Sequence, residues 1–197
     1  MTWYVIDGMD GSGKSTAGTM LKSELESFGR YVLEVTHPNE QRILGRITDR
    51  FLRFPGGKFW ELLATIFYIF DVLMSLIHVR RHGSMYDDII FIRYSMAVAY
   101  VPKRMVRNTY RIVESILPVP DVKVFVDIEP QVALDRINSR GESLEVFETY
   151  ERLSKVRGKM KMISHDWYII DNSGSNQELR DQIRRLLSLR SNNEGSN

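Results

Sequence analysis

The chain has no cysteine among its 197 residues, which excludes disulfide bonds and cysteine-ligated metal centres. It also lacks a charge imbalance, because 27 Lys and Arg face 25 Asp and Glu, for a formal net charge of +2. Such a small basic excess does not indicate nucleic acid as the main partner. With 43% hydrophobic and 26% charged residues, the composition predicts one globular domain with a sizeable core.

An uninterrupted apolar run long enough to cross a membrane is missing too, since such a helix needs about 20 residues almost without charge. The most apolar stretch, Phe59–Val79, contains Glu61 and Asp71 and is followed by a basic cluster at 78–82. A helix that is apolar on nearly all sides is usually buried in a core or in an oligomer interface. We therefore expect this segment to be buried and to provide a homodimer contact, and membrane association is the less favoured alternative.

Residues 8–15 read Gly-Met-Asp-Gly-Ser-Gly-Lys-Ser, which is the Gly-x4-Gly-Lys-Ser pattern of a phosphate-binding loop. A strand-like run, Trp3–Asp7, precedes the pattern and a helix-like segment, Thr16–Phe28, follows it. In such a loop the backbone N–H groups point at phosphate oxygens, Lys14 reaches the β- and γ-phosphates and the Ser15 hydroxyl binds Mg²⁺. The alternative is a glycine-rich turn without a ligand. The predicted nucleotide-binding residues are Gly8, Met9, Asp10, Gly11, Ser12, Gly13, Lys14, Ser15 and Thr16.

Strand-like and helix-like segments alternate along the whole chain. Strands are expected at Trp3–Asp7, Tyr31–Thr36, Ile89–Arg93, Val122–Asp127 and Trp167–Asp171. Helices are expected at Lys14–Phe28, Gln41–Phe51, Phe59–Val79, Met96–Ile116, Pro130–Asn138, Leu144–Ser164 and Asn176–Leu189. This alternation predicts an α/β fold with a five-stranded parallel sheet and helices on both faces. Ligands of such sheets bind beyond the carboxyl ends of the strands, where the sequence places Asp7, His37, Arg93 and Asp127.

No long linker or internal repeat divides the chain. We expect one domain over residues 1–190 and a polar tail over residues 191–197,. Because the chain enters the phosphate loop almost at once, no signal peptide is predicted, and the expected location is the cytoplasm.

With these strand ends placed, the chain resembles the thymidylate kinase family over nearly its full length. The likeness rests on Ile6–Thr16 around the phosphate loop, Ile92–Ser95 with Ala99-Tyr100 downstream, Pro120–Ile137, and Arg140-Gly141 followed by Phe147-Glu148. Each match is weak alone, and their order and spacing together are fairly specific. The resemblance implies a P-loop nucleoside monophosphate kinase fold, a lid at about residues 138–148, and transfer of the γ-phosphoryl group of Mg²⁺-bound ATP to dTMP.

The resemblance also implies roles for individual side chains. Lys14, Arg93 and Arg140 would be catalytic, because they would stabilise charge on the transferring phosphoryl group. The acceptor nucleotide would be bound by Asp10, Tyr68, Arg93 and Tyr100, and ATP also by Arg136. From the residues alone, plainer alternatives stay open: a turn residue for Asp10, a salt bridge for Arg93, core packing for Tyr68 and a solvated charge for Arg140. His37 is expected to be a turn residue.

Four positions depart from the family's pattern. Ile92 stands where the family has an aspartate that supports Mg²⁺, and Val72 where it usually has an arginine near the acceptor. Glu40, after the second strand, and Val146, in the lid, occupy segments where the family often has arginine. An isoleucine cannot support a metal ion, so we expect Ser15 and Asp127 to hold Mg²⁺, with Asp7 as the alternative carboxylate. Candidates to replace the missing acceptor arginine are Arg42, Arg46 and Arg50.

The lead hypothesis is therefore a cytoplasmic, homodimeric kinase that transfers phosphoryl from ATP to a nucleoside monophosphate, with dTMP as the first choice. Losing one charge contact to a phosphoryl transition state commonly slows the reaction about a hundredfold or more. Because the departures lie around the acceptor and the metal, two alternatives stay open. One is a kinase for a different nucleotide, nucleoside or small molecule, and the other is a catalytically weak ATP-binding protein that acts through association.

Overall fold

The computed structural model describes residues 1–37, 58–139 and 149–194. Several expectations fall outside these ranges: the helix over Gln41–Phe51, nearly all of the lid, and residues Glu40, Arg140 and Val146. The candidate arginines 42, 46 and 50 lie outside them as well.

The centre of the molecule is a five-stranded sheet with the order β2-β3-β1-β4-β5, and every neighbouring pair of strands is parallel. The strands are β1 (Thr2–Asp7), β2 (Val32–Thr36), β3 (Asp88–Ile92), β4 (Val122–Asp127) and β5 (Tyr168–Asp171). This confirms the predicted α/β fold. The third strand is expected to end at Arg93, but β3 ends one residue earlier, at Ile92. Arg93 leaves the extended conformation, with a φ of 62°.

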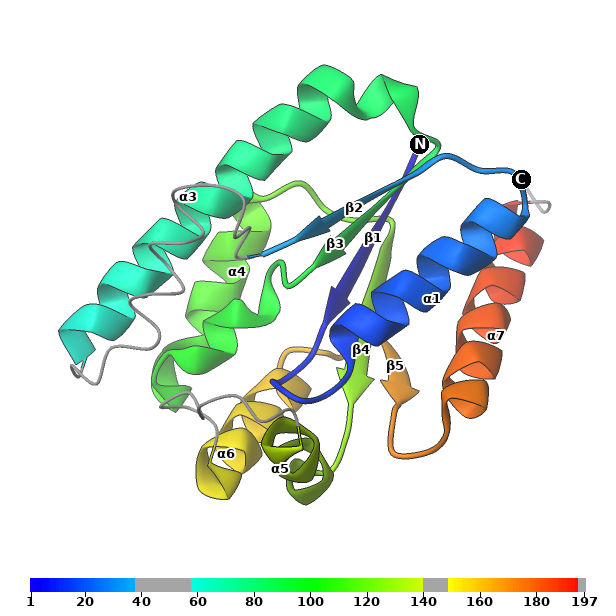
Figure 1. Ribbon diagram of the computed structural model, residues 1–197. Helices are drawn as coiled ribbons and strands as arrows, with labels where there is room; N and C mark the ends of the chain where they lie inside the picture. The colour runs from blue at the N-terminus through cyan, green and yellow to red at the C-terminus, as the bar shows by residue number, and fades with distance from the viewer. Residues whose placement is uncertain (38–57, 140–148, 195–197) are drawn as a thin grey trace.

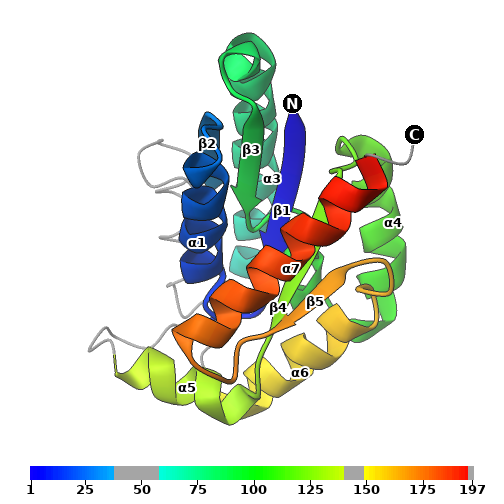
Figure 2. The same cartoon turned by 90° about the vertical axis from the view of Figure 1, so that its right-hand side faces the viewer.

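Helices cover both faces of the sheet, as predicted (Figures 1 and 2). They are α1 (Lys14–Ser27), α3 (Lys58–His82), α4 (Val106–Ile116), α5 (Pro130–Asn138), α6 (Tyr150–Lys161) and α7 (Asn176–Glu194). Helices α1 and α7 pack on one face through Leu21, Leu25, Ile183 and other apolar side chains. Helices α3, α4, α5 and α6 contribute to the core on the other face. Alternate residues of each strand contribute to the two cores, since successive side chains of a strand point to opposite faces of the sheet.

Several predicted helix boundaries are wrong. Helix α3 continues to His82, three residues beyond the predicted Val79, and α6 ends at Lys161, three residues before the predicted Ser164. The helix expected over Met96–Ile116 is divided into two short 3₁₀ turns, Met96–Tyr100 and Lys103–Met105, followed by α4. Pro102 lies between the two turns, and proline has no N–H to continue a helical hydrogen-bond ladder. Helix α7 ends at Glu194, five residues beyond the predicted Leu189, so the first part of the expected tail is helical.

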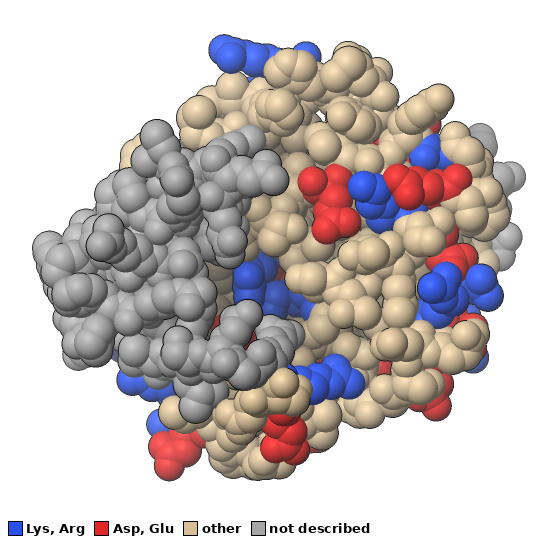
Figure 3. All heavy atoms as spheres, in the orientation of Figure 1, with Lys and Arg blue, Asp and Glu red and all other residues tan. Residues whose placement is uncertain are grey.

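Helix α3 is amphipathic over its described side chains. Val72, Leu76 and Val79 are buried against the sheet, whereas Phe70, Met74 and Ile77 are 53%, 47% and 44% exposed. Within the described part of the chain, no helix combines the length and the apolar character that crossing a bilayer requires. On the face drawn in Figure 3, Lys and Arg and Asp and Glu stand among many other residues, and neither sign of charge dominates the described surface. The outer row of α3, Phe70, Met74 and Ile77, is therefore an exposed apolar surface.

Candidate functional site

The predicted phosphate loop connects β1 to α1 at the carboxyl end of the sheet (Figure 1). Gly11 and Gly13 have φ angles of 72° and 87°, in the left-handed region that favours glycine,. A Cβ on Gly11 would also lie 2.5 Å from the carbonyl oxygen of Ala133 in α5. The loop therefore needs glycine for its backbone turn and for its close approach to α5.

Lys14 projects its ammonium group back into this loop. Its Nζ donates a hydrogen bond to the carbonyl oxygen of Met9 at 2.6 Å and lies 3.7 Å from Asp10 Oδ1. The first turn of α1 contains no acidic residue, and Ser15 and Thr16 are exposed there. A helix N-terminus carries partial positive charge and unpaired N–H groups. Lysine and helix end together make an anion site of the kind that binds phosphate.

Asp10 joins the loop to two further predicted residues. Arg93 Nη2 donates to Asp10 Oδ1 at 2.7 Å, and the Tyr100 hydroxyl donates to Asp10 Oδ2. Burial alone would raise the pKa of Asp10, but the charges of Lys14 and Arg93 outweigh it and hold that pKa below its ordinary value. Asp10 is therefore a stable anion between two cations. The structure thus brings together Lys14, Asp10, Arg93 and Tyr100, which the sequence predicted for one site.

The turn that carries Arg93 is held by Asp7, at the end of β1. Asp7 Oδ2 accepts hydrogen bonds from the N–H groups of Tyr94, Ser95 and Met96 at 3.1, 3.1 and 3.0 Å. Burial raises the pKa of Asp7 above its ordinary value, although the three N–H donors and the charge of Lys14 oppose the shift. Asp7 is therefore an internal brace of the turn after β3.

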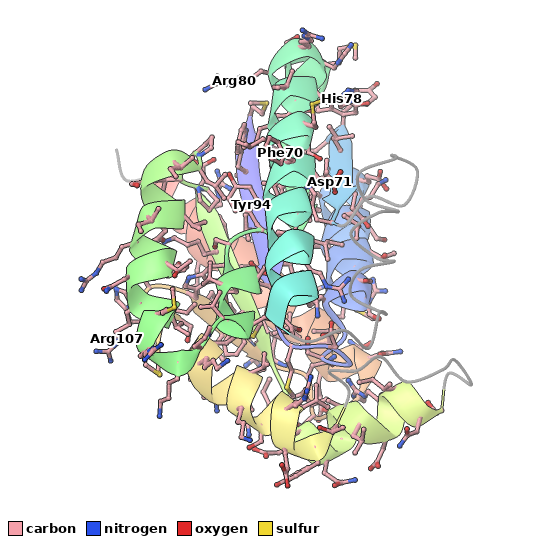
Figure 4. The ribbon with its side chains drawn as sticks, turned by 90° about the vertical axis from the view of Figure 1, so that its left-hand side faces the viewer. Phe70, Asp71, His78, Arg80, Tyr94 and Arg107 are labelled. Atoms are coloured by element: carbon pink, nitrogen blue, oxygen red, sulfur yellow. The ribbon has the colours of Figure 1, made fainter. Side chains whose placement is uncertain are left out.

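Tyr68 lies on α3 beside the same turn. Its hydroxyl donates to the carbonyl oxygen of Tyr94 at 3.4 Å, and its half-buried ring meets the His37 ring edge-on, with centroids 6.2 Å apart. Figure 4 views this side, with α3 in front of the sheet and Tyr94 beside it. The ring thus has core contacts and some exposure, and base stacking by Tyr68 stays a prediction.

Two of the departures from the family pattern lie in the core. Ile92 is 0% exposed and packs against α1, where a Cβ added to Gly18 would come within 2.5 Å of Ile92 Cδ1. Val72 is 2% exposed in the core on the other face. Both side chains therefore serve packing.

Asp127, predicted to support the metal ion, forms ion pairs with two side chains of α6. Arg157 binds its two carboxylate oxygens at 2.7 and 3.0 Å, and Lys161 Nζ lies 2.9 Å from Oδ2. Burial would raise the pKa of Asp127, but the hydrogen bonds from Arg157 and Lys161 hold it below its ordinary value. These contacts tie β4 to α6, so the geometry favours a structural role, and metal binding by Asp127 stays a prediction. Among the described residues no cluster of three or more His, Asp or Glu forms a metal site.

Ser15 fits a metal ion that arrives with a nucleotide. Mg²⁺ usually keeps several waters and is held by one or two protein oxygens together with substrate phosphates. An exposed hydroxyl at the first turn of α1, beside the predicted phosphate site, provides such an oxygen.

Arg136 and Asn172 meet behind the phosphate loop. Arg136 Nη2 donates to the carbonyl oxygen of Asn172 at 2.9 Å, and Asn172 Nδ2 donates to the carbonyl oxygen of Ser12 at 2.7 Å. A Cβ on Gly13 would lie 3.7 Å from Arg136 Nη1. Arg136 is thus placed next to the loop, and ATP binding by Arg136 stays a prediction. Asn172 was not found from the sequence, and neither was the burial of His37, which is 0% exposed.

The chain is similar to known proteins over most of its length. The family model described as thymidylate kinase matches residues 6–183. A thymidylate kinase of Leptospira interrogans is 28% identical over 201 residues, covering 94% of each chain. A protein of Archaeoglobus fulgidus named "Probable thymidylate kinase" is 26% identical over 188 residues, covering 92% of each chain. Among solved structures, the thymidylate kinase of Candida albicans has a similar fold, with a TM-score of 0.75, 18% identity and coverage of 97% of this chain and 92% of that one.

Proposed function

We propose that this chain, which belongs to the thymidylate kinase family and is a kinase, transfers the γ-phosphoryl group of ATP to dTMP. The observation that carries the proposal is the placement of Arg93 and Lys14 on either side of Asp10. Arg93 Nη2 lies 2.7 Å and Lys14 Nζ lies 3.7 Å from Asp10 Oδ1. Phosphoryl transfer chiefly requires that two phosphate groups are held in line and that positive charge surrounds the moving group. Lys14 and Arg93 supply that charge from two different elements.

In this proposal each side chain has one task. The loop N–H groups and Lys14 bind the β- and γ-phosphates of ATP. Asp10 keeps Lys14 and Arg93 close together, and with Tyr100 it orients the acceptor sugar. Arg93, whose side chain is 39% exposed, has guanidinium donors beyond the one given to Asp10 and turns them to the transferring phosphate. Arg136 lies against the loop on the ATP side.

Mg²⁺ bound with ATP would be held by Ser15 and would neutralise charge on the phosphates. Both carboxylates that the sequence offers for this metal ion have other contacts. Asp127 is paired with Arg157 and Lys161, and Asp7 accepts hydrogen bonds from the turn after β3.

A second candidate function is a kinase with a different acceptor. Ile92 and Val72 support it, because both fill core positions with apolar side chains where the family resemblance implies charged groups near the metal and the acceptor. A catalytically weak ATP-binding protein is the remaining alternative. Cytoplasmic location and homodimer formation stay predictions.

The test is to incubate the purified protein with Mg²⁺-ATP and a panel of nucleoside monophosphates and nucleosides, and to follow ADP and product by chromatography. Saturable formation of dTDP supports the proposal. A preference for another acceptor would instead support the second candidate function. ATP binding without turnover of any acceptor contradicts both. In the Lys14→Ala variant we expect turnover to fall about a hundredfold or more, whereas Lys22→Ala, farther along α1, should leave it unchanged.

A further inference from the structure

His37 is a buried histidine at the carboxyl end of β2, and the proposed function gives it no task. Its backbone N–H donates to the carbonyl oxygen of Ile92 at 3.0 Å and so continues the pairing of β2 with β3. Its side chain then reaches the next carbonyl, with Nδ1 3.0 Å from the oxygen of Arg93. One residue therefore holds two successive carbonyls at the point where β3 ends.

The second ring nitrogen faces α3. His37 Nε2 lies 2.9 Å from Ser75 Oγ, and the ring is stacked on Phe91 at a centroid distance of 5.9 Å and an angle of 10°. A carbonyl oxygen only accepts hydrogen bonds, so Nδ1 must carry the proton that is directed at Arg93. The ring thus connects β2, the turn after β3 and α3 in one defined tautomer.

That turn needs such support. Arg93 is the only described non-glycine residue with a positive φ, at 62°. The left-handed conformation is unfavourable for an L-residue other than glycine, because Cβ then crowds the following carbonyl oxygen, and it persists where the surroundings impose it. Here the N–H of Arg93 donates to the carbonyl oxygen of Ile6 at 3.0 Å, and its own carbonyl accepts from His37. Both peptide groups of the strained residue are therefore fixed by neighbours.

The backbone conformation decides where the Arg93 side chain points. With φ in the left-handed region the guanidinium reaches Asp10 at 2.7 Å. If the backbone of Arg93 relaxed to negative φ, its side chain would point away from Asp10, and the positive charge beside Lys14 would be lost. A displacement of about 1 Å can slow a positioned reaction about a hundredfold.

We propose that His37 is a positioning residue for phosphoryl transfer: its Nδ1–H holds the Arg93 carbonyl and so keeps the Arg93 guanidinium on Asp10. The inference rests on the proposed function in one respect, the action of Arg93 on the transferring phosphate. The placement of Arg93 itself does not depend on which acceptor is used.

The experiment compares His37→Asn, His37→Gln and His37→Phe. Asparagine carries an amide N–H close to the place of Nδ1, glutamine carries it closer to Nε2, and phenylalanine keeps the ring without either nitrogen. We expect kcat to fall roughly tenfold to a hundredfold in the Phe and Gln variants, with KM for ATP unchanged because the phosphate loop is intact. His37→Asn should recover most of kcat. His165→Asn, at a histidine whose side chain is 81% exposed, is the matched control.

A second measurement separates this inference from the proposed function. The side-chain Nη2–H resonance of Arg93 in ¹⁵N-labelled protein, assigned with Arg93→Lys, reports the contact with Asp10 without any turnover. We expect it to be kept in His37→Asn and shifted in His37→Phe and His37→Gln, even if dTMP is not the acceptor. Equal kcat and an unchanged Arg93 resonance in all three variants would overturn the inference. Should His37→Phe not fold, the Asn and Gln pair decides, since equal behaviour of these two contradicts a role for Nδ1.

Discussion

Asp10 is the residue at which the two parts of the site meet. It receives the ammonium of Lys14 from the phosphate loop at 3.7 Å and the guanidinium of Arg93 from the turn after β3 at 2.7 Å. Because these charges hold the pKa of Asp10 below its ordinary value, the carboxylate stays ionised at neutral pH. Its negative charge lets two cations lie close together before any phosphate arrives.

The first prediction at this scale concerns Arg93. In Arg93→Ala we expect turnover to fall about a hundredfold or more, because one charge contact to the transferring group is lost. Steady-state kinetics give the change, and thermal unfolding shows whether the fold is kept. Arg107→Ala, at an exposed arginine of α4 (Figure 4), is the control. Equal turnover of wild type and Arg93→Ala would refute the assigned role.

The second concerns Ile92, where a carboxylate would restore the family's metal-supporting residue. The side chain is fully buried against α1, so Ile92→Asp places a charge in the core and should lower the free energy of unfolding by roughly 3 kcal/mol or more. Ile92→Val should cost about 0.5–1.5 kcal/mol. Urea unfolding of both variants tests this. A stable Ile92→Asp with raised activity would instead mean that the position opens to the metal site.

At the scale of elements, α1 is fastened to α7 by a buried carboxylate. Glu24 on α1 accepts from Arg180 Nη1 at 2.8 Å and from Arg184 Nε at 2.9 Å. The hydrogen bonds from Arg184 and Arg180 lower the pKa of Glu24 below its ordinary value. Since α1 begins at the phosphate loop, this contact connects the loop to the C-terminal helix.

A group with a lowered folded-state pKa stabilises the protein above its unfolded-state pKa, and this contribution is lost as the pH falls. We therefore expect Glu24→Gln to lower Tm at pH 7 and to differ less from wild type below about pH 4.5, the ordinary pKa of this group. Circular dichroism melts at both pH values measure the difference. Glu26→Gln, at an exposed glutamate on the same helix, serves as control. A Tm difference that does not change with pH would rule out the charge as its cause.

Features that are local along the chain could be predicted from the sequence, whereas contacts between distant residues could not. The five strands follow from local apolar runs, and the phosphate loop from one contiguous motif, so both were found. His37 contacts Arg93 across 56 positions and Asn172 contacts Ser12 across 160, and such pairs are created by the order of the strands in the sheet. Asp127 is predicted to support a metal ion because it ends a strand near the phosphate loop, and its pairing with Arg157, 30 positions away, is a contact that the sequence does not reveal.

At the scale of the whole molecule, the exposed row of Phe70, Met74 and Ile77 on α3 is the surface through which we expect a homodimer. Exposed apolar patches on otherwise polar proteins commonly mark interfaces. We predict that Phe70→Glu combined with Met74→Glu converts a dimer to a monomer in size-exclusion chromatography with light scattering. Met85→Glu, at an exposed methionine away from this row, should not. A wild-type protein that elutes as a monomer at micromolar concentration would contradict the expectation.

The brace formed by Asp7 has a consequence for motion. Three successive amides, those of Tyr94, Ser95 and Met96, are bonded to one buried carboxylate oxygen, so none can open to solvent without disturbing the other two. In deuterium exchange they should therefore behave as one unit, with a common rate that is slow for a segment outside regular helix and strand. The exchange rate of a peptide spanning these residues then becomes a direct measure of how often the Arg93 turn comes apart.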